Sequence, residues 1–208
     1  MNKLVVGVIA VIAGGIGFFA YRLALAPREA EPVVAELRRP ASGMPDVLPA
    51  FSLQNRAGQL QSIQDWPQKS MIVNFWATWC APCRREIPLL NELNRTRSAQ
   101  GFQVVGVAVD FREDVLKYAD EIGIDYPILI GEQDGLNAVN SFGVEAVGFP
   151  FTAFTDSQGR IITLHVGELR GPQAKVILDT ITRVNSGELS PATARTAVAR
   201  ALAALPHG

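Results

Sequence analysis

The chain has very few side chains that could hold a metal ion or form a structural disulfide network. Its 208 residues include two cysteines, two histidines and three methionines. A zinc site usually needs four ligands, and the two histidines, His165 and His207, are single and far apart in sequence. Both cysteines lie in one Cys-x-x-Cys unit, Cys80 and Cys83, so no disulfide framework can be drawn. We expect neither a resident metal nor a disulfide-stapled fold.

The chain also lacks an excess of charge of either sign. Nineteen basic and twenty acidic residues give a formal net charge of −1, so nothing electrostatic suggests a nucleic-acid partner. There is no internal repeat and no glycine-rich phosphate-binding loop. Without its N-terminal apolar and proline-rich segments the chain keeps about 160 residues, the size of one ordinary domain. We expect one globular domain that uses no cofactor.

The two cysteines lie where a strand-like run gives way to a helical pattern. Residues 71–76 are apolar and rich in strand formers, and residues 84–93 carry apolar side chains at helical spacing. Cys80 therefore falls at a helix N-terminus, where free N–H groups and the helix dipole stabilise a thiolate. Pro82 is tolerated this early in a helix. The spacing predicts thiol–disulfide exchange, with Cys80 as the exposed nucleophile and Cys83, one turn deeper, as the resolving thiol.

The segment around the cysteines carries a family resemblance. Residues 73–88, VNFWATWCAPCRREIP, resemble the active-site block of thioredoxin-fold proteins, and most of all that of the membrane-anchored TlpA/ResA/CcmG group of bacterial thiol–disulfide oxidoreductases. Other blocks also match the family and occur in its order: residues 49–53 before this segment, and residues 142–144, 148–152 and 156–161 after it. The resemblance spans residues 46–184. It implies an α/β thioredoxin fold, with a central mixed sheet flanked by helices.

The remaining pattern fits this architecture. A buried strand is expected at 102–109, followed by the helix and short strand (113–122 and 126–130) that separate the TlpA-like group from minimal thioredoxin. A hairpin is expected from residues 152–155 and 161–164. The last elements expected are a core helix over 172–184 and a C-terminal helix that begins after Ser190-Pro191. The C-terminal helix either packs on the domain or binds a partner, and packing is favoured.

The resemblance also assigns a partner-binding surface. Pro150 matches the cis-proline that faces the dithiol in this family, and the backbone of Phe149 would lie beside an extended partner peptide. The family more often has a smaller residue in place of Phe149, whose ring is expected to cover the sulfurs. Trp79 is expected to shield the dithiol and, with Pro82, to border the same surface.

Two further positions bear on proton transfer. Asn74 occupies the place of a buried aspartate in true thioredoxins, and an asparagine cannot relay a proton. Glu86 matches a glutamate that ResA-like proteins carry near the dithiol. A partly buried carboxylate there would raise the pKa of the cysteines and could shuttle protons. The alternative is a solvated carboxylate on the surface of the helix.

The N-terminus predicts a membrane anchor. An uncharged segment runs from Leu4 to Tyr21, and as a helix it would span about 27 Å, close to one hydrocarbon core. Residues 24–26 resemble a signal-peptide cleavage site, but the apolar run is longer than is usual for such peptides. We expect four parts in the chain: a single-pass transmembrane anchor (1–26), an extended proline-rich tether (27–45), a thioredoxin-like domain (46–185) and a helical extension (186–208).

The resemblance implies a protein of the inner (cytoplasmic) membrane with its thiols in the periplasm or outside the cell. In that oxidising location it would reduce disulfides of partner proteins, of the cytochrome c maturation or copper-centre assembly type, with electrons from an upstream membrane donor. One alternative is a disulfide oxidase or isomerase that uses the same chemistry. Another is a Cu(I)-binding chaperone, since two thiolates suit Cu(I), although no histidine or methionine cluster accompanies them.

Overall fold

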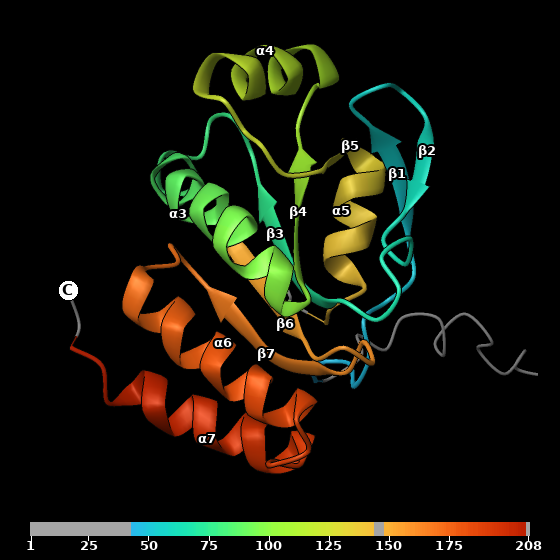
Figure 1. Cartoon of the computed structure of the whole chain (residues 1–208). Helices are drawn as coiled ribbons and strands as arrows, with labels where there is room; N and C mark the ends of the chain where they lie inside the picture. Colours follow the sequence, from blue (N-terminus) through green and yellow to red (C-terminus); the bar gives the residue numbers. More distant parts are fainter. Residues whose placement is uncertain (1–42, 144–147, 207–208) are drawn as a thin grey trace, which may run out of the picture. The chain divides into compact units, whose positions relative to one another are not determined.

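The computed structural model describes residues 43–143 and 148–206 (Figure 1). The expected membrane anchor, residues 1–26, and nearly all of the tether over 27–45 lie outside the described residues, as does His207. In the two described ranges, no helix combines the length and the apolar composition needed to cross a membrane.

The described residues fold as an α/β domain built on one mixed sheet. Its seven strands lie in the order β2-β1-β5-β4-β3-β6-β7, and the interior strand β3 pairs in parallel with β4 and antiparallel with β6. This arrangement confirms the expected thioredoxin-like architecture. The elements are β1 (Ser52–Asn55), β2 (Leu60–Ser62), β3 (Ser70–Trp76), α3 (Ala81–Arg97), a 3₁₀ turn (Ser98–Gln100), β4 (Phe102–Val109), α4 (Arg112–Ile122), β5 (Ile128–Gly131), α5 (Gln133–Asn140), β6 (Phe151–Thr155), β7 (Ile161–Val166), α6 (Gly171–Asn185) and α7 (Pro191–Ala203).

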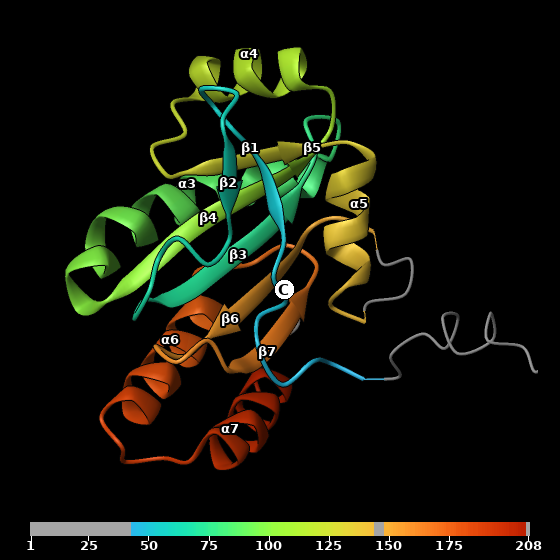
Figure 2. The same ribbon diagram turned by 90° about the vertical axis from the view of Figure 1, so that its right-hand side faces the viewer.

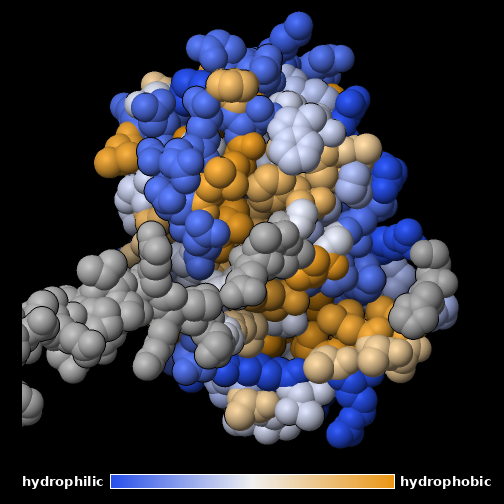
Figure 3. Space-filling view, turned by 180° about the vertical axis from the view of Figure 1, so that it is seen from behind, coloured by the Kyte–Doolittle hydropathy of each residue, from blue (hydrophilic) through white to orange (hydrophobic). Residues whose placement is uncertain are grey.

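Helices cover the two faces of the sheet unequally. Buried side chains of α3, α4, α6 and α7 share one apolar cluster, whereas α5 contributes to a second cluster on the other face. Figure 2 shows α3 and α5 on opposite sides of the sheet. Seen from behind, the molecule displays apolar side chains near the middle of its surface, between hydrophilic ones (Figure 3). The cysteines belong to the cluster under α3, the more fully covered side.

Helix α5 was not expected from the sequence. Gly135 lies in its first turn and two asparagines follow, and glycine and asparagine are poor helix formers. The helix forms because it packs on β4, and Gly135 permits that approach, since a Cβ there would lie 3.1 Å from Val109 Cγ2. Tertiary packing thus overrides local propensity in this segment.

The C-terminal helix α7 packs on the domain, as favoured above. Its Ala194 and Val198 are completely buried in the cluster shared with α3 and α6. Arg195 donates hydrogen bonds to the Ile161 carbonyl and to Asp46 Oδ1, both at 2.8 Å. The helix thereby ties the start of β7 to the residues that precede β1.

Gly106, in the middle of β4, is packed against two buried aromatic rings. A Cβ added to it would lie 2.9 Å from Tyr126 Cε2 and 3.0 Å from Trp76 Nε1. Gly106→Ala is therefore expected to lower the free energy of unfolding by about 1–3 kcal/mol, because a close-packed core accommodates added volume poorly. Gly171→Ala is the matched control, since no heavy atom lies within 4 Å of its added Cβ. Urea denaturation measures both, and an unchanged midpoint in Gly106→Ala would contradict this packing.

Candidate active site

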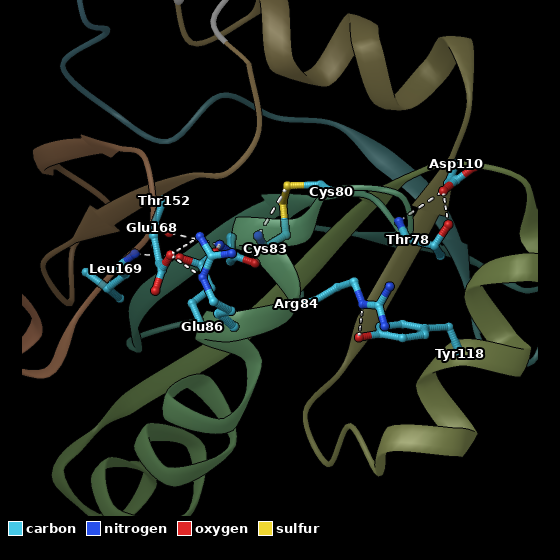
Figure 4. The surroundings of a disulfide bond; sticks show 12 residues. Thr78, Cys80, Cys83, Arg84, Glu86, Asp110, Tyr118, Thr152, Glu168 and Leu169 are labelled. Carbon is cyan, nitrogen blue, oxygen red and sulfur yellow. Dashed lines mark hydrogen bonds and ion pairs between the residues drawn. A yellow bond between two sulfur atoms is a disulfide. The ribbon is translucent and has the colours of Figure 1, made fainter.

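The two cysteines form a disulfide at the N-terminus of α3 (Figure 4). Cys80 is the N-cap residue, and its Sγ accepts a hydrogen bond from the Cys83 N–H at 3.2 Å. Pro82 lies in the first turn of the helix, as expected. Cys80 is 4% exposed and Cys83 0%, so Cys80 is the outer residue of the pair, but the expectation that it is exposed is wrong.

The segment before β6 packs on the cluster that contains the disulfide. The Phe149–Pro150 peptide bond is cis, as the resemblance implied, and Pro150 is buried. The Phe149 ring packs against the cluster that contains both cysteines and lies 5.9 Å from the Trp79 ring, centroid to centroid. Trp79 itself is 68% exposed. Two aromatic rings therefore lie together, one from the residue before Cys80 and one from the residue before the cis-proline.

The turn that leads into Cys80 is held by Asp110, which the sequence analysis did not single out. Asp110 Oδ2 accepts hydrogen bonds from the Thr78 N–H at 3.0 Å and from Thr78 Oγ1 at 2.5 Å. Figure 4 shows this pair beside the cysteine turn. The available signal was a carboxylate placed directly after the buried strand β4, the parallel neighbour of β3.

Glu86 is buried one helical turn after Cys83, with 1% of its surface exposed, so it is not the solvated carboxylate of the alternative reading. Its Oε1 accepts a hydrogen bond from Asn74 Nδ2 and its Oε2 one from the Leu169 N–H, both at 2.6 Å. Loss of solvation raises the pKa of Glu86 from 4.5 to about 7, although both hydrogen bonds oppose the shift; the nearby Glu168 carboxylate also raises it. Glu86 can therefore gain or lose a proton near neutral pH.

Asn74 has a role that sequence reasoning missed. Besides donating to Glu86, its amide donates to Thr152 Oγ1 at 3.0 Å, and Thr152 is its register partner on β6. Asn74 and Thr152 are both completely buried. The asparagine in the place of the thioredoxin aspartate thus binds a carboxylate supplied by α3.

Two arginines of α3 follow Cys83, and both contact other elements. Arg84 donates to the Tyr118 hydroxyl at 3.1 Å and lies over its ring, with 5.1 Å from guanidinium carbon to ring centroid. Arg85 pairs with Glu168 at 2.5 Å. The Arg84 side chain therefore contacts α4, and the Arg85 side chain contacts the turn after β7.

Comparison with known proteins agrees with this geometry. Residues 41–180 match the family model described as Redoxin, which covers well over half of the chain. The chain is a thiol–disulfide oxidoreductase of the redoxin family. It is 33% identical over 134 residues to the thiol–disulfide oxidoreductase ResA of Geobacillus thermodenitrificans, covering 64% of this chain and 75% of that protein. It is 34% identical over 137 residues to the thioredoxin-like protein YneN of Bacillus subtilis, covering 63% and 76%.

Solved structures of thiol–disulfide exchange proteins share the fold. A thiol:disulfide interchange protein of the thioredoxin family from Chlorobium tepidum superposes with a TM-score of 0.52 and 29% identity, covering 78% of this chain and 99% of that one. A secreted thiol–disulfide isomerase from Corynebacterium glutamicum gives 0.57 and 25%, covering 73% and 85%. The redox-active pair of this oxidoreductase is Cys80–Cys83, of the ResA type.

Proposed function

We propose that this oxidoreductase reduces disulfides of partner proteins. The Cys80 thiolate attacks one partner sulfur, which forms a mixed disulfide and releases the other partner sulfur as a thiolate. Cys83 then gives up its proton and attacks Cys80 Sγ, which closes the Cys80–Cys83 disulfide and releases the second partner sulfur. Two electrons pass to the partner. Glu86, ionised above about pH 7, accepts the proton of Cys83.

The buried carboxylate of Glu86 is the observation that carries the direction of this proposal. A negative charge one turn from Cys83 disfavours a second negative charge on sulfur, so it raises the pKa of the thiols. Strong disulfide donors depend on the opposite effect, a thiolate so well stabilised that the reduced form is favoured. The site therefore suits a dithiol that is readily oxidised, which is a reductant.

The surface around the disulfide suits a peptide in extended form. The exposed Trp79 ring, next in sequence to Cys80, and the neighbouring Phe149 ring give it an apolar border. A partner strand would lie against the backbone at Phe149–Pro150 and place its disulfide over Cys80. By family resemblance the proposed partners are apocytochrome c or proteins of copper-centre assembly. The domain would work outside the cytoplasmic membrane, anchored by residues 1–26 and fed by a membrane electron donor.

The direction of electron flow is testable with a peptide. The fully reduced full-length protein, in mild detergent, is mixed with an equimolar disulfide peptide containing Cys-x-x-Cys-His, and both redox states are read by mass spectrometry after acid quenching. We expect the peptide to become reduced and the protein to end as the Cys80–Cys83 disulfide. If instead the oxidised protein converts the reduced peptide to its disulfide, the protein is an oxidase and the proposal fails.

A further inference from the structure

A row of three side chains crosses the sheet beside Glu86. Asn74 on β3 is in register with Thr152 on β6, and Thr152 is in register with His165 on β7. Directly opposed residues of antiparallel strands lie on the same face of a sheet. His165 therefore lies on the face that carries Asn74 and the buried carboxylate of Glu86.

A single peptide group connects His165 to Glu86. His165 Nε2 lies 3.3 Å from the Glu168 carbonyl oxygen, and the Leu169 N–H donates to Glu86 Oε2 at 2.6 Å. The Glu168 carbonyl and the Leu169 N–H are the two ends of one peptide unit. The imidazole and the carboxylate thus bind opposite ends of the same peptide dipole, and Figure 4 shows Leu169 beside Glu86.

The turn that holds this peptide is fixed at two further points. The Gly167 N–H donates to the Pro150 carbonyl at 2.9 Å, next to the cis peptide bond. The Glu168 side chain pairs with Arg85 of α3. Hydrogen bonds and an ion pair therefore already fix the residues around the Glu168–Leu169 peptide group. The contact with His165 affects only the orientation and polarity of this peptide group.

We propose that His165 is a positioning residue for Glu86. Its Nε2–H donates to the Glu168 carbonyl, holds the peptide in place, and polarises it so that the Leu169 N–H becomes a stronger donor to the Glu86 carboxylate. Burial lowers the pKa of His165 below 6.5, so the imidazole is neutral at pH 7 and acts as a dipole. The inference rests on the proposed proton transfer by Glu86 for its functional meaning.

Other groups also face Glu86. Glu168 comes from the turn after β7 and forms an ion pair with Arg85. Tyr126 precedes β5, and the charge of Glu86 raises its pKa. Cys83 lies one turn earlier on α3. All of them stay unchanged when His165 alone is replaced. A change in the titration of Glu86 in such a variant therefore reports on the contact between His165 and the peptide.

The test is a pH titration of Glu86 by NMR in the oxidised full-length protein, in mild detergent. The Glu86 carboxyl carbon and the Leu169 amide proton are followed together, and in the wild type both should move with a midpoint of about 7. His165→Leu is expected to raise the midpoint by about 0.5 pH unit, because the peptide donor is weakened. His165→Gln, whose side-chain N–H can replace Nε2–H, is expected to restore it. Thr163→Val, on the same strand and face, is the control and should leave it unchanged.

An unchanged midpoint in His165→Leu, or no restoration by His165→Gln, overturns the inference. If His165→Leu does not fold, His165→Asn replaces it, since its shorter amide cannot reach the carbonyl, and the same rise is expected. The titration involves no thiol chemistry, so its failure leaves the proposed function standing. Conversely, if Glu86→Gln keeps the wild-type pH dependence of disulfide reduction, the proposed proton transfer by Glu86 is wrong. That holds even if His165→Leu shifts the Glu86 midpoint as expected.

Discussion

Cys80→Ser is expected to reduce disulfide exchange to the uncatalysed background, whereas Cys83→Ser is expected to stop the reaction half-way. Cys80 is the outer residue of the pair and the N-cap of α3, where the helix N-terminus stabilises its thiolate. Cys83 is completely buried and can attack only the sulfur beside it. Without Cys83 the mixed disulfide on Cys80 has no internal thiol to resolve it.

Mass spectrometry of the mixture with a disulfide peptide tests this assignment. The chain has only two cysteines, so any adduct in a single variant is on a known residue. Cys83→Ser should accumulate one peptide adduct that a reducing agent removes, and the wild type, as the control, should accumulate almost none. If a peptide adduct forms in Cys80→Ser but not in Cys83→Ser, the assignment is wrong: Cys83 is then the nucleophile and Cys80 the resolving thiol.

Glu86→Gln is expected to remove a large pH dependence of stability. The pKa of Glu86 is raised from 4.5 to about 7 in the folded protein, so the folded state holds this proton more tightly than the unfolded chain does. The contribution of this proton to the free energy of unfolding is fully present below about pH 4.5. It declines as the pH rises and is lost above about pH 7. The decline amounts to about 3 kcal/mol for a shift of this size. Glutamine does not ionise and should not show it.

Urea denaturation of the oxidised protein at pH 4 and pH 8 measures this effect. The difference in unfolding free energy between Glu86→Gln and wild type should change by about 3 kcal/mol between the two pH values, in favour of the variant at pH 8. Glu92→Gln is the matched control, an exposed carboxylate on the same helix, and should differ from wild type by the same small amount at both. A constant difference for Glu86→Gln would show that its carboxyl titrates normally in the folded state.

The fold and the position of the dithiol could be predicted from the sequence because both depend on local signals. The apolar run before Cys80 and the helical spacing after it indicate a strand followed by a helix, and β3 and α3 lie there. The buried strand 102–109 was predicted with its observed bounds. Helix α5 was missed because Gly135 and its neighbouring asparagines give no helical signal, and the helix depends on contact with β4.

The partners of Glu86 could not be predicted, because they come together only through the order of the strands. Asn74 and Thr152 are 78 residues apart, yet they meet because β6 pairs with β3. The contact between the Phe149 and Trp79 rings likewise depends on the fold, which brings Phe149 against the cluster around the cysteines. His165 was considered only as a metal ligand, since its contact with the Glu168 carbonyl follows from the turn after β7.

The reduction potential of Cys80–Cys83 tests the central claim, that this dithiol is a reductant, most directly. The full-length protein is equilibrated with thiol buffers of defined potential at pH 7, and the oxidised fraction is counted by thiol alkylation. We predict a potential at or below that of thioredoxin, about −270 mV. A value near the strongly oxidising end of the scale, about −120 mV, would contradict it and make the protein a disulfide donor.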